Sequence, residues 1–178
     1  MSKSQSSRYT STCSDVFATL LCDSGKCVAD VVIALDTSIS VGWSDLEHIR
    51  TFLSKLVDHV INNLDMETGR IPVGLLTYSS TVRPLFDLSL YTTVAPIQAA
   101  ISSFTFSRGA TDTAAALAYV RTMMLTSLAG ARDHVQKIVI VLTDGKSKDP
   151  EATKVHKHTH NLCVHFLNRE HTSWWWDR

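Results

Sequence analysis

Two long apolar runs in the sequence end in an aspartate accompanied by hydroxyl side chains. They are "VVIALDTSIS" and "KIVIVLTDG", and a third segment, "SRGATDT", offers a further threonine. Carboxylate and hydroxyl oxygens are hard ligands, which suit Mg²⁺ or Mn²⁺ better than zinc or copper. The sequence therefore predicts a divalent-cation site. Its candidate ligands are Asp36, Ser38, Ser40, Thr111 and Asp144.

These ligands can meet only if the fold brings the ends of two strands together. The run "ADVVIALD" is continuously apolar up to its final aspartate and has the length of a strand, as is typical of a strand buried on both faces of a parallel sheet. "KIVIVL" has the same character. In open α/β sheets, ligands bind in the crevice at the carboxyl ends of the parallel strands. We therefore expect Asp36 and Asp144 to lie in that crevice, with Thr111 arriving from a neighbouring loop.

The remaining segments predict helices and an antiparallel edge. "SDLE" reads as a capping box of Ser44 and Glu47 that opens a long amphipathic helix. "IPVGLLTYSS" and "STVRPLFDLS" read as two strands joined by a tight turn, and "TTVAPIQAAISSF" as a short helix. "TDTAAALAYVRTMMLTSL" reads as a longer one. The predicted fold class is α/β: a doubly wound, mostly parallel sheet with helices on both faces and one antiparallel edge strand.

Composition narrows the classes of partner. The chain has 178 residues, 44% of them hydrophobic, which is enough for one globular domain with a core. Its 17 basic and 17 acidic residues cancel, so charge gives no case for nucleic acid or an anionic membrane. No apolar run approaches the roughly 18 residues that span a bilayer. The longest near the N-terminus, "VFATLL", is shorter than the core of a signal peptide.

The cysteines argue against zinc, and they favour a disulfide if the chain is extracellular, whereas a cytosolic chain would keep free thiols. Cys13, Cys22, Cys27 and Cys163 include no C-x-x-C spacing of the kind that zinc sites use. Three of them crowd ahead of the first predicted strand. We expect a bridge from Cys27 to either Cys22 or Cys13, with Cys163 left free.

"DTSIS", "GATDT" and "LTDG", in this order, resemble the von Willebrand factor A domain over residues 29–155. In "GATDTAAAL" this chain departs from the usual family pattern at Ala110, Asp112 and Ala114, but it keeps the liganding threonine, Thr111. The resemblance implies a Rossmann-like fold and a metal-ion-dependent adhesion site, the five residues named above being its ligands. Residues 1–28 would then be a polar leader with cysteines, and 156–178 a divergent tail.

The resemblance also implies a function. Domains of this family in collagens, matrilins and integrins serve adhesion and matrix assembly. We therefore expect a cation-dependent binding module, not an enzyme, located outside the cell although no signal peptide is visible. Its partner would be a protein that presents Glu or Asp, such as collagen or another matrix protein. A carboxylate of the partner would complete the coordination of the Mg²⁺ or Mn²⁺ ion.

Two other functions are also compatible with the sequence. An intracellular scaffold of the same fold would fit the missing signal peptide. A magnesium-dependent phosphatase resembling the haloacid dehalogenases would need a general acid two residues after its nucleophilic aspartate, and that position is Ser38.

The C-terminal part predicts an incomplete domain. "LCVHFL" alternates like a fifth strand, but the helix expected before it and the elements expected after it are not recognisable. An exposed strand edge there would allow self-association of the chain.

Overall fold

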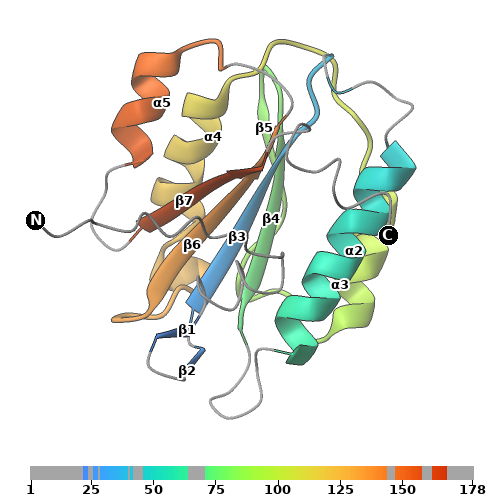
Figure 1. The fold of residues 1–178 in the computed structure, drawn as a ribbon, viewed down its shortest axis with the longest axis vertical. Coiled ribbons are helices and arrows are strands. Elements are labelled where there is room, and N and C mark those ends of the chain that lie inside the picture. The colour runs from blue at the N-terminus through green and yellow to red at the C-terminus, as the bar shows by residue number, and fades with distance from the viewer. Residues whose placement is uncertain are drawn as a thin grey trace, which may run out of the picture.

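The computed structural model describes residues 22–23, 26–27, 29–39, 41, 46–63, 71–143, 147–157 and 162–167. Its centre is a five-stranded sheet with the order β5-β4-β3-β6-β7, in which only β5 runs antiparallel (Figure 1). The predicted fold class is confirmed, and "LCVHFL" forms a fifth strand, which lies beside "KIVIVL". The strands are β3 (Ala29–Asp36), β4 (Val73–Tyr78), β5 (Val82–Phe86), β6 (Gln136–Leu142) and β7 (Leu162–Leu167).

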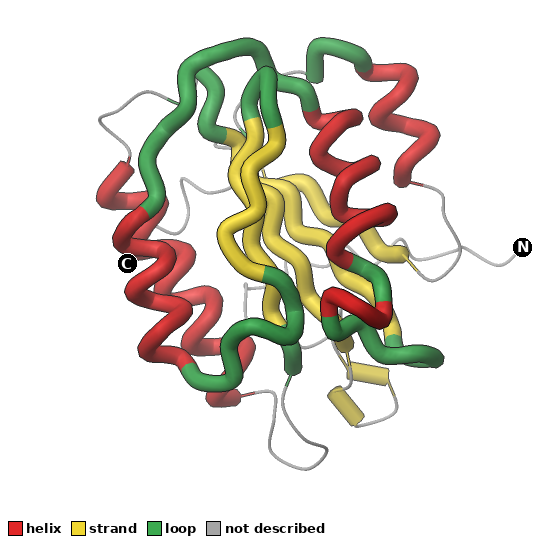
Figure 2. Tube along the Cα trace, turned by 180° about the vertical axis from the view of Figure 1, so that it is seen from behind, coloured by secondary structure: helices red, strands yellow, loops and turns green. Residues whose placement is uncertain are grey.

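Helices cover both faces of the sheet. The helices α2 (Leu46–Asn63) and α3 (Val94–Ser103) pack on one face, and α4 (Thr113–Tyr119) packs on the other (Figures 1 and 2). Side chains of β3 alternate between the two apolar cores: Ile33 faces α2, whereas Val32 faces α4. Burial on both faces explains why β3 is a continuous apolar run. None of the helices in the described part combines the length and apolar composition needed to cross a bilayer.

The prediction of one long helix over residues 111–128 is wrong for the second half of that range. Here α4 ends at Tyr119, and a π-helical turn, η2 (Val120–Met124), follows it. The amide of Leu125 donates to the carbonyl oxygen of Val120 at 2.9 Å, which closes the wider turn. Met124 is buried in the core beside Gly74, which has no side chain to obstruct it. Thr126 then starts a separate short helix, η3 (Ser127–Ala129).

The expectation that no helix precedes "LCVHFL" is also wrong. Helix α5 (Pro150–Lys157) lies there, close to α4 and β7 (Figure 1). Asp149 starts this helix by accepting a hydrogen bond from the amide of Ala152 at 2.9 Å, and Pro150 occupies the first helical position. The pattern was missed because α5 is short and mostly polar. Self-association at the β7 edge stays a prediction.

A small hairpin precedes β3. Its strands, β1 (Cys22–Asp23) and β2 (Lys26–Cys27), are antiparallel, and their register makes Cys22 and Cys27 direct partners. Facing residues in such a ladder have Cα atoms about 4.5–5.5 Å apart, within the range of disulfides. This register favours Cys22 over Cys13 as the partner of Cys27. Cys163 pairs with Ile138 on β6, two strands from β3.

We predict that glutathione disulfide oxidises the Cys22 and Cys27 thiols to one disulfide, with two protons released and two electrons passed to the oxidant. Peptide mapping without reduction should show the bridge in the wild type, in Cys13→Ser and in Cys163→Ser. It should be absent from Cys22→Ser. Four free thiols after oxidation, or a bridge that persists in Cys22→Ser, would contradict the assignment.

Candidate metal centre

The carboxylate of Asp36 is fixed at the carboxyl end of β3. Its side chain is fully buried. The amide of Ser38 donates to Asp36 Oδ1 at 2.8 Å, and the hydroxyl of Thr143 donates to Asp36 Oδ2 at 2.6 Å. Because Thr143 directly follows β6, these bonds join the ends of two adjacent parallel strands. The carboxylate therefore lies at the carboxyl ends of the parallel strands β3 and β6.

Thr111 reaches the same point from a different loop. Its hydroxyl donates to Ser38 Oγ at 2.9 Å, across 73 positions of sequence. The position of Thr111 follows from the start of α4, because the next residue, Asp112, caps that helix by accepting from the amide of Ala115 at 3.1 Å. The carbonyl oxygen of Thr111 also accepts from the amide of Lys148 at 2.8 Å. Hydrogen bonds thus hold the chain at Thr111 and at Asp112.

The structure brings three of the five predicted ligands together: Asp36, Ser38 and Thr111. The other two, Ser40 and Asp144, lie outside the described residues. Ser40 is two positions beyond Ser38, and Asp144 directly follows Thr143, whose hydroxyl contacts Asp36. Their roles as ligands stay a prediction.

The described oxygens fit a small hard cation. Mg²⁺ binds oxygens at about 2.0–2.1 Å in octahedral geometry, which puts neighbouring ligand oxygens about 3 Å apart. The hydroxyl oxygens of Ser38 and Thr111 are separated by 2.9 Å. In the described part of the chain no three His, Cys, Asp or Glu side chains gather into a metal-binding group, so hydroxyls make up most of the described donors. This donor set fits magnesium or manganese.

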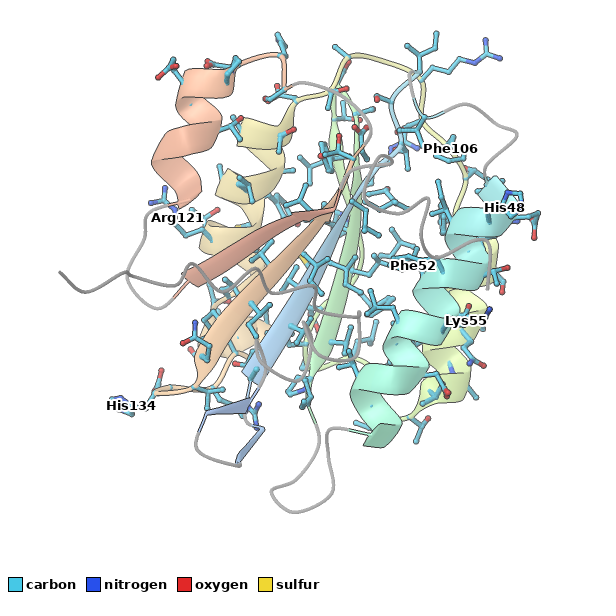
Figure 3. All side chains as sticks on the ribbon, viewed as in Figure 1. His48, Phe52, Lys55, Phe106, Arg121 and His134 are labelled. Atoms are coloured by element: carbon cyan, nitrogen blue, oxygen red, sulfur yellow. The ribbon has the colours of Figure 1, made fainter. Side chains whose placement is uncertain are left out.

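The rim of the candidate site carries an apolar side chain. Ile39 follows Ser38, and it is 73% exposed although Thr37, Ser38 and Val41 of the same loop are buried. Its amide donates to the carbonyl oxygen of Gly109 at 3.3 Å, which ties it to the loop of Thr111. Figure 3 shows Phe106, from the same loop, at this end of the sheet. The side chain of Ile39 is thus exposed to solvent beside the candidate metal ligands.

Sequence reasoning missed four hydroxyl residues that support the site. Thr143 had a weak signal, since it stands just before Asp144 at the end of an apolar strand. The other three are ordinary loop residues in the sequence and gave no signal of their own. They are Thr37, Ser79 and Ser107, which are hydrogen-bonded to one another beside the ligands.

Comparisons with known proteins agree with this geometry. The profile of the von Willebrand factor type A domain matches residues 30–163. Human matrilin-1 is 38% identical over 125 residues, which cover 70% of this chain and 24% of that protein. The mouse collagen alpha-4(VI) chain is 33% identical over 123 residues, or 68% of this chain and 5% of that protein. The chain thus spans a quarter or less of these relatives.

A solved structure shares the fold. Proximal thread matrix protein 1 from the mussel byssus superposes with a TM-score of 0.70 and 24% identity, over 80% of this chain and 40% of that one. A further structure of that protein, with the same TM-score and 23% identity, has a zinc-occupied MIDAS motif. At these identities the likeness concerns the fold alone. Given the family profile and the matrilin match, the chain belongs to the von Willebrand factor type A domain family.

Proposed function

We propose that this chain is a divalent-cation-dependent binding module for matrix proteins. One Mg²⁺ or Mn²⁺ ion would be held by Asp36, Ser38, Ser40, Thr111 and Asp144. The observation that carries the proposal is the contact of two hydroxyls from distant loops, Thr111 and Ser38, beside the buried Asp36 carboxylate. The metal would supply an electrophilic position to which a carboxylate of a partner binds.

The chemistry of the ligands explains why such an ion would accept a partner. The three hydroxyl oxygens are neutral and compensate none of the positive charge of the ion, so the ion stays electrophilic where the two aspartates act partly through water. An acidic residue of the partner would then be attracted to the remaining coordination position. The mussel protein carries zinc in its MIDAS motif, so zinc belongs in any panel of metals that is tested.

The partner we propose is an extracellular matrix protein that presents Glu or Asp, with collagen as the first candidate. The relatives named above are a collagen chain and a matrilin, which supports this choice and an extracellular location. We propose binding as the function, and no catalysis. The exposed side chain of Ile39 would contact an apolar group of the partner next to its acidic residue.

Binding to immobilised collagen tests this function. We expect the wild-type chain to bind in millimolar Mg²⁺ or Mn²⁺, and to be released by a chelator. Asp36→Ala should not bind, because the metal is lost with its carboxylate ligand. Conversion of the carboxyl groups of the collagen to amides should also abolish binding. Binding that persists in the chelator and in Asp36→Ala would contradict the proposal.

A pair of surface variants separates the partner contact from metal binding. Ile39→Ser removes the apolar side chain without adding charge, and should weaken collagen binding about tenfold while the affinity for Mn²⁺ is kept. The matched control is Leu128→Ser on η3, since Leu128 is 96% exposed and lies at the opposite end of α4 from Thr111. Equal losses in both variants would show that Ile39 has no specific contact with the partner.

A further inference from the structure

Three hydroxyl groups form a connected bridge beside the candidate metal ligands. Ser79 Oγ lies 3.0 Å from Ser107 Oγ, and Ser107 Oγ lies 2.8 Å from Thr37 Oγ1. The hydroxyl of Thr37 in turn donates to the carbonyl oxygen of Tyr78 at 3.1 Å. The three residues come from three different loops, which follow β3, β4 and α3. We call this set, Ser79, Ser107 and Thr37, the hydroxyl bridge.

The direction of the hydrogen bonds in the bridge follows from proton counting. A hydroxyl has one hydrogen, and that of Thr37 goes to the Tyr78 carbonyl, which can only accept. Ser107 must therefore donate to Thr37. Its hydrogen is then used, so Ser79 must donate to Ser107. Every hydroxyl hydrogen has one acceptor, and such chains strengthen each bond by polarisation.

The bridge is connected to both halves of the candidate site. Thr37 is fully buried and stands between Asp36 and Ser38. Ser107 stands four positions before Thr111, on the loop that delivers it. The carbonyl oxygen of Ser79 accepts from the amide of Asp112 at 3.0 Å, directly after Thr111. A bridge that joins these points fixes the loop of Thr111 against the loop of Asp36 and Ser38.

We propose that the hydroxyl bridge positions Thr111 against Asp36 and Ser38, so that it sets the affinity for the metal without touching the ion. This inference rests on the metal-dependent function proposed above. Its residues are positioning residues that act through the ligands. Outer-shell hydrogen bonds of this kind typically change metal affinity by about 10–100-fold when they are removed.

Affinity for Mn²⁺, measured by calorimetric titration of the full chain, tests the bridge. Thr37→Val keeps the shape of the side chain and removes its hydroxyl, and Ser107→Ala removes the central link. Each should weaken Mn²⁺ binding about tenfold or more. Thr37→Ser restores a hydroxyl and should return the affinity to near the wild-type value. The double variant Thr37→Val, Ser107→Ala should lose little more than either single one, because both break the same bridge.

A control and a second readout separate positioning from general stability. Thr122→Val removes an exposed hydroxyl that donates to the Ala118 carbonyl oxygen at 2.9 Å, outside the bridge, and should leave the affinity unchanged. Melting without metal is measured for all variants. Unchanged Mn²⁺ affinity in Thr37→Val and Ser107→Ala, with only a lower melting temperature, would overturn the inference. No Mn²⁺ binding by the wild type would instead overturn the proposed function, and the inference with it.

Discussion

Replacing Asp30 with alanine is expected to lower the free energy of unfolding by about 3–5 kcal/mol. Asp30 is fully buried at the start of β3, and both of its carboxylate oxygens are used. Oδ1 accepts from Arg132 Nε, and Oδ2 accepts from Lys137 Nζ and from the amide of Arg132, each at 2.7 Å. The same two side chains also donate to the carbonyl oxygens of Ala29 and Arg132. The cluster lies at the end of the sheet opposite the candidate metal site.

The effect is large because removal of the anion leaves two cations behind. The side chain of Lys137 is only 16% exposed, and that of Arg132 is 34% exposed. Removing one partner of a buried ion pair leaves the other charge uncompensated in a poorly solvated place. Urea unfolding followed by circular dichroism measures the change. Asp133→Ala, an exposed aspartate on the adjacent turn, is the control and should stay within about 0.5 kcal/mol of wild type. A loss below about 1 kcal/mol for Asp30→Ala would contradict this role.

Gly109→Ala is expected to weaken Mn²⁺ binding about tenfold or more and to lower stability by about 1–3 kcal/mol. Gly109 has a φ of +143°, which residues with side chains rarely adopt. A Cβ atom there would lie 2.5 Å from Ser80 Oγ, the atom that accepts from the amide of Ala110. The loop would have to move, and Thr111 is two residues away. Calorimetric titration with Mn²⁺ and thermal melting measure the two effects.

Gly130→Ala is the matched control for that variant. Gly130 also has a positive φ, +90°, and a Cβ atom there would lie 2.8 Å from the amide nitrogen of Ser89. The strain is similar, but Gly130 lies after η3 and outside the loops of the candidate metal ligands. It should lower the melting temperature and leave Mn²⁺ affinity unchanged. Equal losses of affinity in both variants would show that general stability controls binding, and would contradict a specific role for the Gly109 loop.

Much of the fold was predictable because it depends on patterns within single segments. The apolar run of β3 can be recognised from its consecutive residues alone. The same holds for α2, in which Leu53, Leu56 and Val57 recur at helical spacing. The π-helical turn of η2 was not predictable, since Met124 at its end packs beside Gly74, a contact that only the tertiary structure creates. Helix α5 was missed because a short polar helix lacks an apolar stripe.

In the candidate site, too, some residues could be predicted from the sequence and others could not. Asp36, Ser38 and Thr111 could be predicted as candidate ligands because of their places at strand ends and in loops that resemble the family motifs. The roles of Thr37, Ser79 and Ser107 could not be predicted. Nothing in the sequence around a loop serine or threonine indicates that its hydrogen-bond partner lies 28 or 70 positions away. The pair of Asp30 with Arg132 is of the same kind, since 102 positions separate the two residues.

Thermal melting with added metal tests the central claim most directly. An ion that binds only the folded chain stabilises it by about 2.7 kcal/mol at a concentration of one hundred times its Kd. For a chain of this size that corresponds to a rise in Tm of roughly 5–10 °C. We predict this rise for the wild type in Mg²⁺ or Mn²⁺ and none for Asp36→Ala. No shift of the wild type at millimolar ion, or an equal shift in Asp36→Ala, would contradict a metal site built on Asp36.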